Sequence, residues 1–323
     1  YFRGRNTEGR DMAAMFGDLE SLADNPGYRD RDARLALMDG QGLERAFLFP
    51  TLGVGMQEAL RHDLPALHAA FRAFNLWLDE DWGFDHDGRL FAAPMLTLAD
   101  PTEAVAEVDR VLAAGARLVV MVPGPVPTAN GYQSPGIADY DPVWARLEEA
   151  DVPVAFHAGL SGTSQYGKVW ESGPAQFEAF RHSSFPLVAF ADRTISDTFA
   201  ALICHGVFCR FPGLRILSIE NGGMWVPELL RHMGSAHGKM PFAFERHPVE
   251  QFLANVWVSP YFEDDMVMLR DLLGIERLLF GSDFPHAEGL ADPLAYVDEL
   301  EGFNDDEIRK VMRDNADGLI GAG

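Results

Sequence analysis

Three polar residues of the sequence follow directly on short apolar segments. His157, Glu220 and Asp283 each stand at the carboxyl end of such a segment. Imidazole and carboxylate groups hold a divalent metal ion while leaving a coordination position open for water. A bound ion lowers the pKa of water to about 7, and a neighbouring carboxylate can take its proton. His157, Glu220 and Asp283 are therefore candidate metal ligands, and Glu220 and Asp283 are also candidate catalytic residues.

Each of the three residues also has a purely structural interpretation. A histidine at a strand end is often a hydrogen-bonding residue, and Glu220 could cap the helix expected near Trp225. Asp283 precedes Phe-Pro and fits a turn. The occurrence of all three at strand ends of one predicted sheet favours a site over three separate structural roles.

Further candidates lie close to these residues in the sequence. His286, three positions after Asp283, could act as an acid or as a hydrogen-bond donor to substrate, or could simply pack its loop. Trp225, Tyr261 and Phe284 are placed to line a substrate pocket, although aromatic residues there are as often core.

The segment from 160 to 200 separates two expected strands and is a candidate lid over the site. It contains Trp170, Phe177 and Arg181. Arg181 could pair with a substrate carboxylate, or could be solvated.

Short apolar segments rich in β-branched residues alternate with segments of helical periodicity. Strands are expected at residues 46–49, 90–95, 117–122, 152–157, 215–220, 256–259 and 277–283. Helices are expected at residues 31–42, 57–81, 101–114, 142–150, 196–211, 225–233, 264–273 and 293–301. Such alternation predicts a mostly parallel sheet with helical crossovers, because parallel neighbours cannot be joined by a hairpin.

The predicted fold class is α/β, a (β/α)8 TIM-type barrel, in which the site lies at the carboxyl ends of the strands. The seven expected strands are one short of eight, so the first strand either lies upstream of Tyr1 or has degenerated. An open doubly wound sheet is the alternative. The stretch 51–56, Thr-Leu-Gly-Val-Gly-Met, lacks the third glycine of a dinucleotide fingerprint and so favours the barrel.

Composition narrows the classes of partner. The 323 residues are 47% hydrophobic, and 49 acidic against 26 basic residues give a net charge of −23. This balance argues against nucleic acid and anionic membranes as partners. The longest apolar runs are too short to span a bilayer.

We expect one domain over residues 1–323 and a small-molecule substrate. We also expect a cytoplasmic location, in which Cys204 and Cys209 are reduced. A homo-oligomer is a common form for such enzymes.

Three motifs in this order resemble those of the amidohydrolase superfamily. They are His157-Ala158-Gly159, Glu220-Asn221-Gly222-Gly223 and Gly281-Ser282-Asp283-Phe284-Pro285-His286. The similarity is greatest to the amidohydrolase-related branch that includes aminocarboxymuconate semialdehyde decarboxylase. The resemblance implies a distorted (β/α)8 barrel with one divalent metal ion, typically zinc. It also implies that His157 is a ligand and that Asp283 is a ligand and general base.

Two departures from the branch bear on the chemistry. No His-x-His motif, which the branch carries at the end of its first strand, occurs in the sequence. Glu220 stands where many relatives carry a histidine. A metal-dependent hydrolase is the leading expectation, and a non-oxidative decarboxylase of an aromatic or muconate-like acid is the second. A metal-free barrel that binds a ligand without turnover is the third.

Overall fold

The computed structural model describes residues 24–50, 53–159, 161–170, 184–189, 192–286 and 289–321. The strands are β1 (Ala46–Leu48), β2 (Leu90–Ala92), β3 (Val119–Met121), β4 (Val126–Thr128), β5 (Gly131–Gln133), β6 (Val154–His157), β7 (Ile216–Ile219) and β8 (Val256–Val258). Apart from the antiparallel β4–β5 pair, all of these strands pair in parallel.

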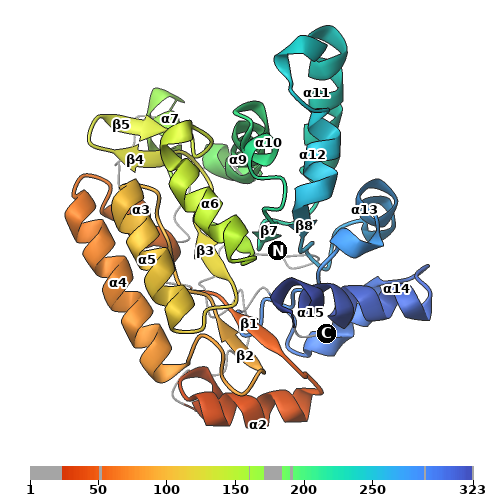
Figure 1. The fold of residues 1–323 in the computed structure, drawn as a ribbon. Coiled ribbons are helices and arrows are strands. Elements are labelled where there is room, and N and C mark those ends of the chain that lie inside the picture. Colours follow the sequence, from red (N-terminus) through yellow and green to blue (C-terminus); the bar gives the residue numbers. More distant parts are fainter. Residues whose placement is uncertain are drawn as a thin grey trace.

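The parallel strands follow one another in chain order (Figure 1). β1 pairs with β2, and β3, β6, β7 and β8 form a four-stranded sheet. Single parallel bridges continue the order: Met95, beyond β2, pairs with Val120, and Leu278 pairs with Val258. Seven parallel positions thus succeed each other, as the seven expected strands predict for a barrel.

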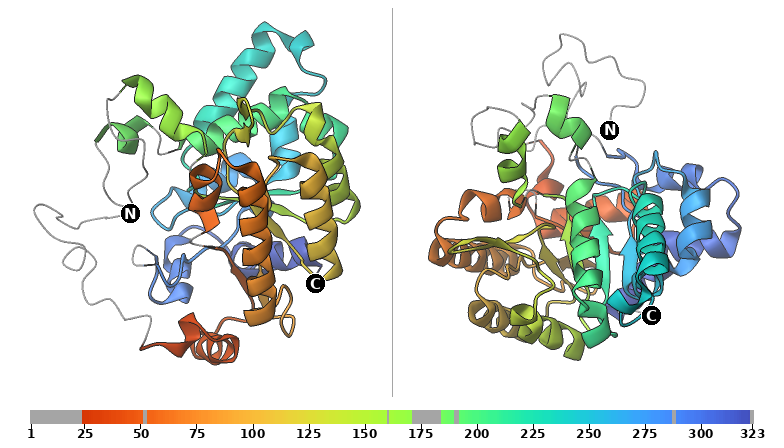
Figure 2. Two further views of the ribbon diagram at one scale, coloured as in Figure 1. Left: turned by 90° about the vertical axis from the view of Figure 1, so that its left-hand side faces the viewer. Right: turned by 90° about the horizontal axis from the view of Figure 1, so that it is seen from above.

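Helices surround these strands on their outer side (Figures 1 and 2). The α-helices are α2 (Arg31–Gln41), α3 (Met56–Ala59), α4 (Leu64–Asp81), α5 (Pro101–Ala113), α6 (Asp141–Glu149), α7 (Thr163–Trp170), α8 (Ser184–Ala189), α9 (Arg193–Cys204), α10 (Val207–Arg210), α11 (Val226–Lys239), α12 (Pro248–Asn255), α13 (Met266–Leu273), α14 (Asp305–Arg309) and α15 (Asn315–Ile320). Shorter 3₁₀ segments are η1 (Pro26–Tyr28), η2 (Gly53–Gly55), η3 (Ala138–Tyr140), η4 (Pro241–Ala243), η5 (Ile275–Arg277) and η6 (Pro293–Glu299), and η7 (Lys310–Asp314) is a π-helical turn.

The strands carry two apolar layers because successive side chains point to opposite faces. Val154 and Phe156 of β6 belong to the outer layer, where Phe156 meets Phe199 of α9. Ala155 belongs to the inner layer, together with Leu217 of β7. His157 shares the inward face of β6 with Ala155. The strand period therefore aims His157 into the barrel.

Two expected helices are interrupted, for local reasons. The helix expected over 57–81 is divided into α3 and α4, since Asp63 caps α4 by accepting a hydrogen bond from the Ala66 amide. The helix expected over 196–211 divides at Gly206, whose φ of 73° is left-handed and ends α9 before α10 begins. The expectation of two unbroken helices was wrong because neither capping nor this turn is visible in hydrophobic periodicity.

The strand expected over 277–283 is also wrong in its extent. Residues Ile275–Arg277 form η5, and the parallel pairing is confined to Leu278. Residues 293–301 hold the 3₁₀ segment η6 in place of an α-helix. The β4–β5 hairpin was not predicted. Its strands are three residues each and one of them contains proline, so they carry little periodic signal.

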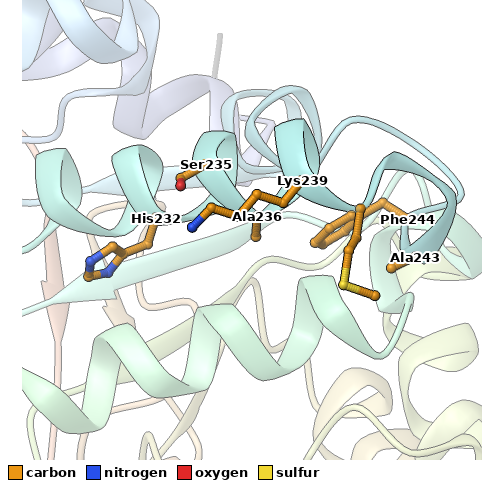
Figure 3. A pocket seen from close by; sticks show the side chains of 7 residues that line it. His232, Ser235, Ala236, Lys239, Ala243 and Phe244 are labelled. Carbon is orange, nitrogen blue, oxygen red and sulfur yellow. The ribbon is translucent and has the colours of Figure 1, made fainter.

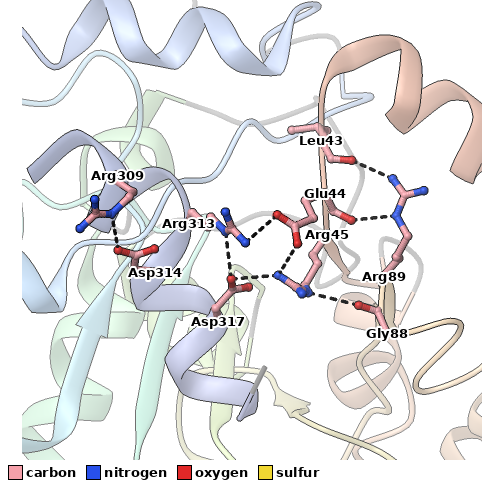
Figure 4. A network of polar contacts seen from close by, with 9 residues as sticks. All are labelled: Leu43, Glu44, Arg45, Gly88, Arg89, Arg309, Arg313, Asp314 and Asp317. Carbon is pink, nitrogen blue, oxygen red and sulfur yellow. Dashed lines mark hydrogen bonds and ion pairs between the residues drawn. The ribbon is translucent and has the colours of Figure 1, made fainter. Parts of the chain in front are cut away.

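The last described segment of the chain, η7 and α15, contacts the residues that precede β1 (Figure 4). Asp317 of α15 pairs with Arg45, at 2.9 Å, and Arg313 pairs with Glu44, also at 2.9 Å. Leu319 and Ile320 are buried in the inner apolar layer. The end of the described chain is thereby fixed beside the start of β1.

Within the described ranges, no strand pairs with the outer edge of β1 or with the far side of Leu278. The expected strand upstream of Tyr1 stays a prediction. None of the helices among the described residues combines the length and apolar character needed to cross a bilayer.

Candidate metal centre

The structure brings together the three polar residues expected at the strand ends and His286, the further candidate expected close to Asp283. His157 is the last residue of β6, and Glu220 directly follows β7. Asp283 and His286 lie on the segment beyond Leu278, which pairs with β8. Because these strands are parallel, their carboxyl ends meet at one edge of the sheet.

Glu220 reaches this cluster through an unusual backbone conformation. Strand alternation would point its side chain the same way as that of Ser218, away from His157. Its φ of 56° is left-handed and interrupts the alternation, and its Oε2 lies 2.8 Å from His157 Nε2. Asp283 shares this feature, with a φ of 55°. Two strained residues other than glycine thus stand at the same edge.

The side chains converge on a small volume. One ligand atom from each of Glu220, Asp283 and His286 lies within 4.8 Å of the others. Asp283 Oδ1 is 3.1 Å from His286 Nδ1. Together with the contact between His157 and Glu220, this places two carboxylates and two imidazoles in one group.

The electrostatics of the group favour a proton or a cation at Asp283. Burial raises the pKa of Asp283, and the nearby Glu220 charge raises it further, while the hydrogen bond with His286 lowers it in part. Two carboxylates that approach each other in a partly buried place repel unless a positive charge lies between them.

The donor set fits a divalent metal ion. His157 Nδ1 lies 3.0 Å from the Ala158 carbonyl oxygen. With a proton on Nδ1 donated to this carbonyl, Nε2, the atom that faces Glu220, would be available to bind a metal ion. Two carboxylate oxygens and imidazole nitrogens form a mixed set that suits manganese as well as zinc.

The predicted pocket residues have different surroundings. The Tyr261 hydroxyl donates a hydrogen bond to the Glu220 carbonyl oxygen, at 2.8 Å. The Phe284 ring packs against Tyr28 and lies 5.5 Å from the Arg34 guanidinium carbon. Trp225 is 4% exposed. Its ring stacks on Phe199 in the outer layer, 5.4 Å away, and its ring contacts are with that layer and not with the four polar side chains.

The candidate lid is described only in part. Phe177 and Arg181 lie outside the described residues. Trp170, at the end of α7, is 62% exposed, and its ring contacts Tyr166 and Phe185. The α7 and α8 segments therefore meet through aromatic side chains, and the role of 160–200 as a lid stays a prediction.

Sequence reasoning missed two residues that support the cluster. Asn221 donates hydrogen bonds from Nδ2 to the carbonyl oxygens of Phe156 and Ile219, and so bridges β6 and β7 beyond their ladder. Asp264 accepts hydrogen bonds from the amides of Gly223 and Tyr261. The Asn-Gly-Gly turn after Glu220 was a signal for the first, and no spacing pattern pointed to Asp264.

A pocket lies elsewhere, along the outer side of α11 (Figure 3). It is lined by residues of α11 and η4 with Phe244, including His232, Lys239 and Met240. None of the four residues of the metal centre lines it, so this pocket has no part in the chemistry of that centre.

Comparison with known proteins agrees with the fold. A gamma-resorcylate decarboxylase from Rhodococcus jostii (strain RHA1) is 29% identical over 267 residues, which cover 79% of this chain and 77% of that protein. The crystal structure of an amidohydrolase from Mycobacterium avium subsp. paratuberculosis K-10 superimposes with a TM-score of 0.91. It is 49% identical in sequence, over 99% of this chain and 80% of that chain.

A more distant structure shares the fold alone. It is a dihydroxybenzoic acid decarboxylase from Polaromonas sp. JS666 with bound manganese. It has a TM-score of 0.69 and 21% identity, and the match covers 96% of this chain and 92% of that chain. The family model for amidohydrolases matches residues 14–321. The expected barrel class and superfamily are thus confirmed, and the chain belongs to the amidohydrolase family.

Proposed function

We propose that this protein is a metal-dependent, non-oxidative decarboxylase of a small aromatic acid. The observation that carries the proposal is the placement of Asp283 among metal donors. Its carboxyl group is partly buried, and its pKa is raised by burial. Decarboxylation requires a group that delivers a proton to the carbon that loses carbon dioxide, and the Asp283 carboxyl group, 3.1 Å from His286 Nδ1, is the group that we assign to this step.

The comparisons support this chemistry over the hydrolase that the motifs alone favoured. The Rhodococcus relative is a decarboxylase of gamma-resorcylate, and the Polaromonas structure is a decarboxylase of a dihydroxybenzoic acid. Glu220, in the position where many relatives carry a histidine, is compatible with a carboxylate-rich metal site. We therefore place decarboxylation first and hydrolysis second.

The metal would be held by Glu220, Asp283 and His286, whose ligand atoms converge, and by His157, whose Nε2 lies beside the Glu220 carboxylate. When bound, a divalent ion would supply positive charge for the substrate carboxylate and for the hydroxyl oxygen on the neighbouring ring carbon. Manganese is the ion we propose, since two carboxylates make the set harder than a zinc site of histidines and cysteines.

The residues of the chain account for the proton in this reaction. The bond between the ring carbon and the carboxylate breaks, carbon dioxide leaves, and the electron pair stays on the ring carbon. We assign to Asp283 the proton that this carbon takes up. Solvent restores this proton to Asp283, and His286 Nδ1, 3.1 Å from Asp283 Oδ1, would orient its carboxyl group. The product is the substrate with hydrogen in place of its carboxylate.

The test is turnover of gamma-resorcylate and related 2-hydroxybenzoates by the manganese-loaded protein in deuterium oxide. We expect carbon dioxide release and a phenolic product with one deuterium at the carbon that lost the carboxylate. Chelation of the metal should stop the reaction. Cleavage of esters or amides without carbon dioxide release from any 2-hydroxybenzoate would favour the hydrolase. Tight ligand binding with neither reaction and no bound metal would favour the metal-free barrel.

A further inference from the structure

We propose that Tyr261 and Asp264 are positioning residues that hold Glu220 in the conformation needed to bind the metal. The inference rests on the proposed metal centre. Tyr261 and Asp264 follow β8, whereas Glu220, the metal ligand that they would position, follows β7.

The Tyr261 hydroxyl contacts the backbone of Glu220 itself. The left-handed φ of Glu220, 56°, is a conformation that a residue with a Cβ adopts rarely. The Tyr261 hydroxyl donates to the Glu220 carbonyl oxygen at 2.8 Å, and so fixes the peptide plane that follows this residue. With that plane fixed, the carboxylate lies 2.8 Å from His157 Nε2.

The carboxylate of Asp264 joins the two loops. Its Oδ2 accepts hydrogen bonds from the Gly223 amide, at 2.6 Å, and from the Tyr261 amide, at 2.9 Å. Gly223 lies three residues after Glu220. One carboxylate oxygen of Asp264 therefore holds both the turn that follows Glu220 and the backbone of Tyr261, the residue that contacts Glu220.

Gly222 packs closely on Tyr261. It has a φ of 63°, and a Cβ built on it would lie 2.7 Å from Tyr261 Cδ2. The turn thus approaches the aromatic ring as closely as a glycine allows. The ring, its hydroxyl group and its amide all contact the segment 220–223 or the Asp264 carboxylate. Movement of Tyr261 would therefore be transmitted to Glu220.

The first experiment compares Tyr261→Phe with Tyr140→Phe. Tyr140 is a matched control because it is also buried and its hydroxyl also makes a hydrogen bond, to Gln133 Oε1, but that bond involves neither Glu220 nor the loop of Tyr261 and Asp264. We expect Tyr261→Phe to weaken manganese binding by about tenfold or more, as loss of a group that orients a ligand does. Tyr140→Phe should bind manganese like the wild type. Titration calorimetry of the purified protein with manganese alone measures both.

The second experiment compares Asp264→Ala with Asp264→Asn. The amide oxygen of asparagine can accept both backbone hydrogen bonds, whereas alanine accepts neither. We expect Asp264→Asn to retain wild-type manganese affinity and Asp264→Ala to lose about tenfold or more. Equal affinity in Asp264→Ala and the wild type would contradict the proposal, because it would show that these hydrogen bonds do not affect the ligand.

A crystal structure of metal-free Tyr261→Phe tests the positioning independently of any metal. We expect Glu220 to leave its left-handed conformation or to lose its contact with His157. An unchanged Glu220 in this variant would overturn the inference even if the wild type binds manganese. Failure of the wild type to bind manganese would instead count against the proposed metal centre, while the structural comparison would still decide the positioning role.

Discussion

Glu220 and Asp283 show how single residues build this site. Each has a Cβ and a φ near +56°. That conformation costs about 1–2 kcal/mol relative to right-handed backbone. Asp87 and Asp151 share this conformation elsewhere, but only Glu220 and Asp283 among these four described residues meet in one cluster of polar side chains, where strained backbone is usually functional.

Replacing Asp283 by asparagine tests its role in proton transfer. Asparagine preserves the size of the side chain but cannot deliver a proton. We expect Asp283→Asn to lower the rate of carbon dioxide release by at least about 100-fold. Asp271→Asn is the control, since Asp271 is 65% exposed and pairs with Arg270. A steady-state assay in which both variants match the wild type would remove Asp283 from the mechanism.

Replacing Glu220 by histidine tests the preference for the metal. Histidine exchanges an oxygen donor for a nitrogen donor and removes one negative charge. We expect Glu220→His to raise the affinity for zinc relative to manganese by about tenfold or more. Competition titrations with the two ions measure this ratio, and Glu228→His on the exposed side of α11 serves as the control. An unchanged ratio would mean that Glu220 is not a ligand.

At the scale of elements, a buried network between α4 and α5 supports the bridge that continues the sheet. Asn75 Nδ2 donates to the Met95 carbonyl oxygen and to Glu107 Oε1, both at 2.9 Å. The Met95 amide donates to Asn75 Oδ1. Met95 in turn pairs with Val120 of β3. Side chains of two helices thus fix the backbone between β2 and β3.

Glu107 makes this network dependent on pH. Burial alone would raise its pKa, but hydrogen bonds with Arg110 and Asn75 more than offset that effect and lower it. The ionised carboxylate therefore contributes stability above the ordinary carboxyl pKa, and this contribution is lost as the pH falls through the lowered value. We expect Glu107→Gln to reduce the free energy of unfolding by about 1–3 kcal/mol at neutral pH.

The difference from the wild type should shrink as urea denaturation is repeated toward about pH 3. Glu103→Gln, on the exposed side of α5, is the control and should show little difference at either pH. A difference for Glu107→Gln that does not change with pH would contradict the ionic origin of the contribution.

Alanine substitutions at two glycines compare the turn after β7, which requires glycine, with helix α11, which does not. Gly222→Ala introduces a Cβ at a φ of 63° and against the Tyr261 ring. We expect it to cost about 1–2 kcal/mol or more and to weaken manganese binding. Gly234→Ala, in α11 with open space around it, should stabilise the protein by about 0.5–1 kcal/mol. Thermal and urea unfolding of both variants provide the measurement, and a neutral Gly222→Ala would contradict the close packing.

At the scale of the whole molecule, α15 brings the end of the described chain to the beginning of its sheet. Asp317 of α15 pairs with the partly buried Arg45, and Arg313 of η7, just before α15, pairs with Glu44 at the surface (Figure 4). Exposed pairs such as that of Arg313 and Glu44 contribute little individually. The larger contribution comes from Leu319 and Ile320, which are 2% and 6% exposed in the inner layer.

Truncation of Leu319 tests this closure. We expect Leu319→Ala to lower the free energy of unfolding by about 2–5 kcal/mol, because it opens a cavity in the inner layer. Leu76→Ala removes the same atoms from a side chain that is 43% exposed and should cost much less. Equal costs for the two variants in urea denaturation would show that α15 is not part of the core.

Local patterns predicted the elements whose signals lie within a few residues. The alternation of apolar strands and amphipathic helices indicated the parallel sheet. Polar residues at strand ends indicated His157, Glu220 and Asp283, and proximity to Asp283 indicated His286. The breaks at Asp63 and Gly206 and the short pairing at Leu278 were missed. Each of these depends on capping, backbone conformation or a neighbouring strand, which hydrophobic periodicity does not encode.

The sequence by itself determined the fold class, the chemical types of the site residues and their order along the chain. Only the tertiary structure decided that Glu220 faces His157, because a left-handed φ reverses the direction that strand alternation predicts. Only the tertiary structure revealed Asp264 as a partner of the turn after β7, 41 residues away from Gly223 in the chain. Residue types and spacing are local properties, whereas the contacts that aim a ligand arise between loops that parallel pairing brings to the same edge.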